Sequence, residues 1–213
     1  SQAAYEDPTF PETQLRMLQA QLNPHFLYNT LDCMKWLGVA NHVPQIAAMS
    51  TDLAALLRAG ISGNELIPLE DELELVRQYL NIQEIRFEDR FVCEIDVDER
   101  FQHCIVPKMV LQPLVENAII HGVADLEEGY IKLWAESDGN DLLLRVSDNG
   151  KGIEPEVLAR LARHEDIPGG HLGLNNVDRI IRLYYGEGYG LTAASDGGNG
   201  SCITLRLPMT KGE

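Results

Sequence analysis

The chain has 213 residues, 45% of them hydrophobic and 23% charged, and its 33 acidic against 17 basic residues give a net charge of −16. This composition is typical of a globular protein with one large domain or two small ones. The acidic balance argues against nucleic acid as the main partner, because binding a phosphate backbone requires a cationic face. A bound nucleotide would have to be attracted locally, by backbone N–H groups, a few side chains and a metal.

The cysteines and the apolar runs indicate where such a chain works. The cysteines are scattered without a C-x-x-C pair, which suits reduced thiols in a cytosolic setting: Cys33, Cys93, Cys104 and Cys202. No apolar run approaches the ~18 residues of a membrane span, and no signal peptide is visible. We therefore expect a soluble, cytoplasmic piece without membrane contact.

The N-terminal segment carries apolar residues at helical spacing, and the spacing continues through Pro24. The positions are Leu15, Leu18, Leu22, Phe26, Asn29/Thr30, Cys33 and Leu37. This register favours one helix that is kinked at Pro24. The alternative is a helix that begins at Pro24 with Asn23 as its N-cap.

A second amphipathic helix follows the loop GVANHVP and repeats the same spacing at Ile46, Met49, Leu53, Leu56 and Gly60. Two such helices form an antiparallel hairpin whose apolar stripe needs a cover. A four-helix bundle made from two chains supplies one, so the sequence predicts a homodimer. The alternative is that the stripe packs on the second half of the same chain. Ser62-Gly63-Asn64 interrupts the pattern, so we divide the chain into a dimerisation hairpin, 1–62, and a second domain, 63–213.

The second domain begins with a predicted helix from Pro68 to about Phe87, in which the acids of PLEDEL occupy the first turn, where the helix dipole favours them. Apolar alternation then predicts strands at 91–98, 130–137, 141–148, 189–196 and 201–208. Helices are predicted at 109–122, 154–163 and 173–184. This order indicates an α+β sandwich, with a mixed, mainly antiparallel sheet and helices on one face.

Three segments of this domain carry side chains that suit a nucleotide. In LVENAIIHG, Asn117 and His121 lie four residues apart on one helix face, where the amide can ligate Mg²⁺ and the imidazole can reach a phosphate. In SDNGKGI, Asp148 is a pure acceptor suited to the exocyclic amine of adenine. Each motif has a common structural alternative: surface groups on a helix for the first and a hairpin turn for the second.

The third segment, GGHLGLNNV, opens a helix with glycines at 169, 170 and 173, which let phosphate oxygens approach free N–H groups at its positive end. The three segments in this order resemble the N, G1 and G2 boxes of the ATP-binding fold shared by gyrase, Hsp90, histidine kinases and MutL. QLNPHFLYNTL and PLEDELELVRQYLNIQEIRFEDRF resemble the phosphoacceptor box and linking helix of sensor histidine kinases of the LytS/YesM type. The resemblance covers about residues 14–208.

The resemblance implies an ATP-dependent histidine kinase that phosphorylates itself on His25 and then an aspartate of a response regulator. It implies that Asn117 binds Mg²⁺, that Asp148 recognises adenine, and that residues from about Ile153 to Leu172 form the ATP lid. The other nucleotide-binding residues would be His121, Gly150, Gly152, Gly170, Gly173 and Leu174. The resemblance also implies that the full-length protein is a membrane sensor.

Two positions depart from related families. Many histidine kinases carry an acid directly after the phosphoacceptor, whereas this chain has Phe26. Asn29, one turn after His25, holds the place where relatives position water to dephosphorylate the regulator.

Gyrase-like members carry a water-activating Glu four residues before the Mg²⁺-binding Asn, and Pro113 stands there in this chain. Glu116 should point about 100° away from Asn117, so rapid ATP hydrolysis is not expected.

Other readings of the chain stay open. An ATP-binding pseudokinase would sense nucleotide and signal by shape alone, and a gyrase-like ATPase would release phosphate. The remaining four histidines are expected to be solvated or structural, with His171 in the lid near the phosphates: His42, His103, His164 and His171. The Pro24 kink, if present, would bend the helix to present the ring of His25.

Overall fold

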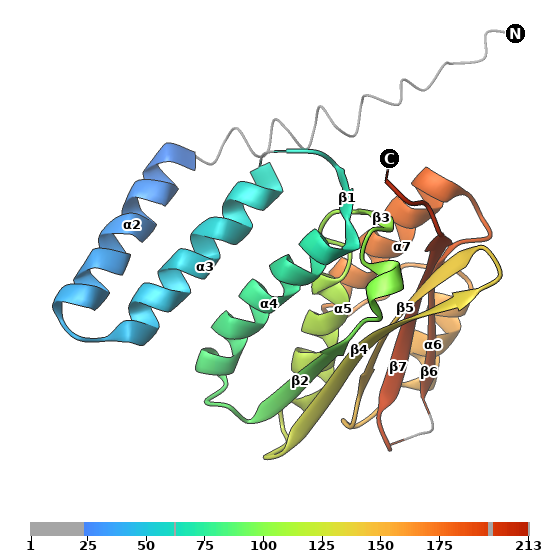
Figure 1. Cartoon of the computed structure of the whole chain (residues 1–213). Coiled ribbons are helices and arrows are strands. Elements are labelled where there is room, and N and C mark those ends of the chain that lie inside the picture. Colours follow the sequence, from blue (N-terminus) through green and yellow to red (C-terminus); the bar gives the residue numbers. More distant parts are fainter. Residues whose placement is uncertain (1–23, 62, 196–197, 213) are drawn as a thin grey trace, which may run out of the picture. The chain divides into compact units, whose positions relative to one another are not determined.

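A computed structural model describes residues 24–61, 63–195 and 198–212. The chain divides into two compact units, with the boundary between Ser62 and Gly63 (Figure 1). The predicted helical positions before Pro24, and with them the proposed kink, lie outside the described residues. Within the described residues, no helix combines the length and apolar character that crossing a membrane requires.

The first unit is a helical hairpin of α2 (Pro24–Ala40) and α3 (Pro44–Ile61). Leu31 and Leu56 are buried where the helices pack, and Gly38 makes the close approach possible, because a Cβ there would lie 2.9 Å from the backbone nitrogen of Ala47. Leu56 belongs to the apolar stripe predicted for α3, but the stripe predicted for α2 lies on a different, exposed face. Phe26 and Leu37 are 64% and 57% exposed. The hairpin therefore buries a narrower face than its apolar pattern provides.

The second unit contains two sheets and the remaining helices (Figure 1). Its elements, in chain order, are β1 (Leu66–Pro68), α4 (Leu69–Arg86), β2 (Phe91–Asp96), η1 (Glu99–Phe101), β3 (Ile105–Pro107), α5 (Gln112–Asn117), η2 (Ala118–Val123), β4 (Gly129–Asp138), β5 (Asp141–Asp148), α6 (Pro155–Ala162), α7 (Leu172–Tyr185), β6 (Gly190–Ser195) and β7 (Ser201–Pro208).

The main sheet has the order β2-β4-β5-β7-β6. The β2–β4 pair is parallel and the other pairs are antiparallel. Alternate residues such as Ile131 and Leu133 are fully buried, because successive side chains of a strand point to opposite faces. Helices α5, α6 and α7 cover one face (Figure 1). The predicted α+β class with a mixed, mainly antiparallel sheet is confirmed.

The helix α4 is joined to the loops of the same unit rather than standing apart. Its first two N–H groups, of Leu69 and Glu70, donate to the carbonyl oxygens of Cys104 and Gln102 at 2.8 and 2.9 Å. Just before it, β1 pairs antiparallel with β3. These bonds satisfy N–H groups that a helix start leaves open.

One predicted helix starts later than expected. The segment 109–122 was expected to be helical throughout, but Met109 has a left-handed backbone (φ 62°) and α5 begins at Gln112. From Ala118 the helix widens into the π-helical η2. A π-bulge of this kind is frequent at functional sites, and this one lies directly after Asn117.

Candidate functional site

A cavity of about 280 Å³ opens between α5–η2 and the start of α7. Five of the predicted nucleotide-binding residues line it: Asn117, His121, Gly170, Gly173 and Leu174. Its other walls are Pro113, Glu116, Ile120 and His171. Segments far apart in sequence thus meet at one concave surface, as expected of a ligand site, although the volume is at the small end for one.

The side chain of Asn117 is buried and faces His171 across this cavity. Nδ1 of His171 lies 3.1 Å from Oδ1 of Asn117, so the imidazole is the donor. The His171 ring also stacks on His121, with centroids 4.2 Å apart. Burial, together with the nearby His121, lowers the pKa of His171 below its usual value. A neutral ring therefore covers the oxygen that was expected to face a metal.

The donor set around Asn117 fits Mg²⁺ carried in by a nucleotide better than a resident metal. Mg²⁺ prefers oxygen ligands and usually keeps waters and phosphate oxygens beside one or two protein groups, and Asn117 offers such an oxygen. Throughout the described part of the chain, no three His, Cys, Asp or Glu side chains are grouped to hold a metal ion. Any metal here would depend on the nucleotide for most of its ligands.

Asp148 lies at the end of β5 and does not line this cavity, and neither do Gly150 and Gly152. Its carboxylate is half-buried and held in place: Oδ1 accepts from the N–H of Gly150 at 2.8 Å and Oδ2 from the hydroxyl of Ser201 at 2.6 Å. Its neighbour in space is Gly122, where a Cβ would lie 2.8 Å from the Asp148 carboxyl carbon. The Asp148 turn therefore adjoins the cavity through the residue that follows His121.

Two glycines permit this contact between η2 and the Asp148 turn. A Cβ on Gly150 would lie 2.2 Å from the carbonyl oxygen of Gly122, a distance that real Cβ atoms do not reach. Neither residue can carry a side chain without separating the two segments. Gly122 of the first motif and Gly150 of the second therefore serve close packing beside Asp148.

The start of α7 forms the opposite wall of the cavity. Gly173 packs on Pro113, and a Cβ at Gly173 would lie 3.1 Å from that ring, so the helix start lies close to α5. The N-cap of α7 is His171, whose ring is directed to Asn117 and His121. Before it, Gly169 and Gly170 both adopt left-handed backbones (φ 83° and 91°). The helix dipole and first-turn N–H groups favour an anion at this point.

His25 lies in the other unit, in the first turn of α2, and is exposed. The amide nitrogen of Asn29 lies 3.3 Å from its Nδ1 and 3.5 Å from its Nε2. An amide can donate to an imidazole nitrogen or accept from it, so Asn29 can influence both the ring orientation and its tautomer. The structure thus brings these two predicted residues together.

Comparison with known proteins assigns the chain to a family. Residues 13–91 match the histidine kinase family, and residues 105–211 match the family of histidine kinase-, DNA gyrase B-, and HSP90-like ATPases. The chain is 38% identical to sensor histidine kinase YesM and 28% identical to sensor protein LytS, both of Bacillus subtilis (strain 168). The chain belongs to the sensor histidine kinases of the LytS and YesM type.

The matches cover most of this chain but only part of the two relatives. The YesM and LytS matches cover 92% and 98% of this chain but 33% and 36% of those proteins, so the chain spans about a third of their length. The histidine kinase domain of the blue-light activated histidine kinase EL346 from Erythrobacter litoralis superposes with a TM-score of 0.52 at 15% identity. That match covers 92% of this chain and 93% of the domain, and it shows a shared fold.

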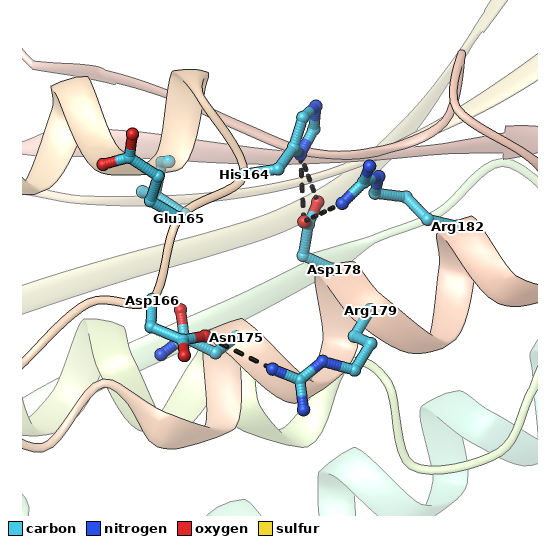
Figure 2. A pocket seen from close by; sticks show the side chains of 8 residues that line it. His164, Glu165, Asp166, Asn175, Asp178, Arg179 and Arg182 are labelled. Carbon is cyan, nitrogen blue, oxygen red and sulfur yellow. Dashed lines mark hydrogen bonds and ion pairs between the residues drawn. The ribbon is translucent and has the colours of Figure 1, made fainter.

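The lid expected for this histidine kinase is tied to α7 along part of its length (Figure 2). Nδ1 of His164 lies 2.9 Å from Oδ2 of the buried Asp178, which also faces Arg182 at 3.9 Å. The amide of Asn175 both accepts from the N–H of Ile167 at 3.2 Å and donates to its carbonyl oxygen at 3.3 Å. His164 is thus a structural residue, as expected, and the lid is anchored as far as Ile167.

Glu116 differs from its expected position. The helical angle between neighbours was expected to direct it away from the Asn117 site, yet it lines the same cavity and is exposed. The cavity curves around α5–η2 from Pro113 to His121, which is wide enough to include both neighbours.

The structure shows contacts or burial of two side chains, His171 and Glu72, that the sequence did not predict. His171 was expected near the phosphates, but its bond to Asn117 depends on the turn made by Gly169 and Gly170 and could not be read from sequence. Glu72 was expected to be a first-turn acid that favours the helix dipole, but it is fully buried. Its spacing from Leu69, Leu73 and Val76, which are buried too, was the available signal.

Proposed function

We propose that this chain is the phosphoacceptor and catalytic region of an ATP-dependent protein-histidine kinase. It phosphorylates His25 and passes the phosphoryl group to an aspartate of a response regulator. The observation that carries the proposal is the single cavity in which Asn117, His121 and the glycine-rich start of α7 meet. An exposed histidine on a separate helical unit supplies the acceptor.

The transfer follows from what phosphoryl chemistry demands, which is positioning and charge neutralisation. A neutral imidazole nitrogen of His25 attacks the γ-phosphorus of ATP in line. The P–N bond forms as the P–O bond to the β-phosphate breaks, ADP leaves with the electron pair, and the remaining ring proton passes to solvent. An aspartate carboxylate of the regulator then attacks the same phosphorus, and the P–N electrons return to the ring.

The cavity and the Asp148 turn beside it have distinct binding roles in this proposal. The carboxylate of Asp148, held by Gly150 and Ser201, accepts a hydrogen bond from the adenine amine. First-turn N–H groups of α7 and the imidazole of His121 receive phosphate oxygens. Asn117 provides the protein oxygen for Mg²⁺, and Mg²⁺, when bound, neutralises charge on the phosphates.

Nucleotide entry requires the cavity to rearrange at His171. Its ring engages Asn117 and stacks on His121, so it occupies space between both predicted ligand residues. The lid is anchored as far as Ile167, and the next residues include two left-handed glycines. We therefore assign the movement to residues 168–171, a shorter segment than the lid expected from Ile153 to Leu172.

The active form is a homodimer in which the hairpins of two chains make a four-helix bundle. The support is the set of large apolar side chains that a single hairpin leaves exposed: Phe26, Met34, Trp36, Leu37, Val39, Val43, Ile46 and Leu53. Apolar surface of this extent marks an interface in soluble proteins. ATP is a cytoplasmic substrate, so we place this region on the cytoplasmic side of a membrane sensor.

Asn29 gives the same unit a second activity, dephosphorylation of the regulator. Its amide lies beside the ring of His25 and is exposed, so it can hold a water for attack on an aspartyl phosphate. The water oxygen would form a P–O bond as the bond to the aspartate oxygen breaks, which releases inorganic phosphate. This activity uses the acceptor site and needs no transfer to His25.

Slow ATP hydrolysis is a second candidate function, and the position of Glu116 favours it. A carboxylate at the wall of the cavity that holds Asn117 can accept a proton from an attacking water. Pro113, at the place where gyrase-like relatives carry their Glu, argues for a low rate. Glu116→Gln would abolish phosphate release while leaving His25 labelling intact if this candidate is correct.

The deciding experiment is incubation with γ-labelled ATP and Mg²⁺. A histidine kinase acquires acid-labile, alkali-stable label, which should disappear in His25→Ala and in Asn117→Ala. His42→Asn is the matched control, because His42 is an exposed histidine of the same hairpin whose left-handed backbone asparagine tolerates. A pseudokinase would bind ATP without label or free phosphate, and an ATPase would release phosphate without label. Either outcome would overturn the proposal.

A further inference from the structure

Glu72 is a buried carboxylate on α4 that the phosphoryl transfer does not use. It has no exposed surface, whereas its neighbours Glu70 and Asp71 are exposed. A buried carboxylate is unfavourable unless hydrogen bonds compensate for the loss of water. Burial raises the pKa of Glu72 to about 7, and the backbone N–H groups around it act in the opposite direction.

Both oxygens of Glu72 bind the segment that precedes α5. Oε2 accepts from the N–H of Met109 at 2.7 Å, and Oε1 accepts from the N–H of Leu111 at 3.1 Å. Leu111 is the N-cap of α5, and its apolar side chain cannot accept from the helix start. Glu72 therefore performs, from a helix about 40 residues earlier in the chain, the task that a capping side chain performs locally.

The capped segment leads directly into the nucleotide cavity. Pro113 and Asn117, both on α5, line it, and Pro113 is also the contact of Gly173 at the start of α7. A shift of the residues before Gln112 would therefore move two walls of the cavity, α5 and the start of α7. The left-handed Met109 makes such a shift easy without an external restraint, because this backbone conformation is unfavourable for a side chain of its kind.

The bonds between α4 and this region run in both directions. N–H groups of Leu69 and Glu70 donate to carbonyls of the 102–104 loop, while Glu72 accepts from the 109–111 segment. The β1–β3 pairing lies between these two sets of bonds. The linking helix is thus part of the frame of the nucleotide site.

We propose that Glu72 is a positioning residue for nucleotide binding, which fixes the start of α5 and thereby the positions of Pro113 and Asn117. The inference rests on the proposed function in taking a magnesium–nucleotide as the ligand. It assigns Glu72 no contact with that ligand. The helix that links the two units would then set the affinity of the site through one side chain.

The test is calorimetric titration of the non-hydrolysable analogue AMP-PNP with Mg²⁺ into the whole chain. Glu72→Ala should weaken binding at least tenfold, and Glu72→Gln three- to tenfold, because an amide keeps the shape but offers one acceptor oxygen and turns a donor toward an N–H. Glu74→Gln is the matched control: it is an exposed glutamate of the same helix and should change the affinity less than twofold.

Amide hydrogen exchange separates positioning from general loss of structure. In Glu72→Gln, the amides of Met109 and Leu111 should exchange faster while those of β5 and β7 stay protected, and initial phosphorylation at saturating ATP should stay within twofold of wild type. Wild-type affinity in Glu72→Gln, or equal loss of protection in the sheet, would overturn the inference. If the wild type itself fails to bind AMP-PNP, the proposed function is wrong. Exchange at Met109 and Leu111 then still decides whether Glu72 holds these two amides.

Discussion

The imidazole of His171 donates its Nδ1–H to the side-chain oxygen of Asn117, 3.1 Å away. The same ring stacks on His121. The lid residue His171 therefore covers part of the cavity, and the oxygen predicted to face a metal already has a hydrogen-bond donor. A bound metal ion and this N–H cannot both occupy that side of the amide.

This relationship predicts that His171→Ala strengthens binding of AMP-PNP with Mg²⁺ by roughly fivefold, since a net hydrogen bond of about 1 kcal/mol no longer competes. Isothermal calorimetry would measure the change. His103→Ala is the control, because His103 is an exposed histidine of the same unit. With EDTA present the gain should be smaller, because no metal then competes with this N–H for the oxygen of Asn117. Weaker binding by His171→Ala would mean that the ring contacts the nucleotide instead of competing with the metal.

The anchored part of the lid gives a second prediction. Asn175 binds both backbone groups of Ile167. Asn175→Ala should therefore lower the free energy needed to detach this part of the lid from α7 by about 1–2 kcal/mol. Tryptic cleavage after the exposed Arg163 should then become roughly tenfold faster. The neighbouring Asn176 is exposed, and Asn176→Ala should leave the cleavage rate unchanged. Equal rates in the two variants would show that other contacts hold the lid.

The parts of the fold that could be predicted from sequence are those set by local pattern. The segments 141–148 and 201–208 are rich in apolar residues and lie between turn-forming sequences, and β5 and β7 have these bounds. The helix from Leu69 to Arg86 was predicted to within one residue, because Pro68 and the acids after it mark its start.

The parts that could not be predicted depend on contacts between distant segments. β1 and β3 have three residues each and exist by pairing with one another. The late start of α5 follows from the left-handed Met109, whose N–H bonds to Glu72, 37 residues earlier. In the candidate site, the motifs predicted Asn117, which lines the cavity, and Asp148, which lies beside it. The bond from His171 to Asn117 required the backbone turn that brings the lid over the cavity.

Glu72 gives a pH-dependent prediction whose sign follows from its raised pKa, about 7 against the usual 4.5. The folded state favours the protonated carboxyl, so the contribution of Glu72 to the free energy of unfolding is fully present below pH 4.5 and is lost as the pH rises to about 7. Glu72→Gln cannot ionise and lacks this loss. The free energy of unfolding of the variant, relative to the wild type, should therefore rise by about 3 kcal/mol between pH 4.5 and 7.

Urea unfolding at several pH values would measure this difference. The chain has two tryptophans, one in each unit, and a Trp36→Phe background leaves Trp134 on β4 to report the second unit alone. Glu74→Gln in the same background is the control, because Glu74 is an exposed glutamate of the same helix. A constant difference between Glu72→Gln and the wild type across this range would contradict a raised pKa.

The proposed dimer can be tested at Leu53, which is 42% exposed on α3. Leu53→Glu should raise the dimer dissociation constant roughly a hundredfold, about 2.7 kcal/mol, because association would bury an unpaired charge. Analytical ultracentrifugation over a range of concentrations would measure it. Gln45→Glu adds the same charge at the exposed first turn of α3 and should leave the dimer intact. Circular dichroism should show unchanged helix content in both. A dimer that survives Leu53→Glu would place the interface on another face.

The contact between Asn29 and His25 predicts the last effect. Asn29→Ala should slow the initial phosphorylation of His25 about tenfold, or ~1.4 kcal/mol in the barrier, because the ring loses the group that orients it. Alanine is the better helix former at this exposed position, so the loss would not come from unfolding. Binding of AMP-PNP, in the other unit, should be unchanged.

Two further variants show whether orientation is the reason. Asn29→Asp replaces the amide donor beside the ring by an acceptor and should restore most of the rate, since a carboxylate can hold an imidazole by its N–H. Asp32→Asn, an exposed change one turn further along α2, should have no effect on labelling. If Asn29→Ala labels His25 at the wild-type rate but no longer dephosphorylates the regulator, Asn29 serves the phosphatase reaction alone and does not orient the ring of His25.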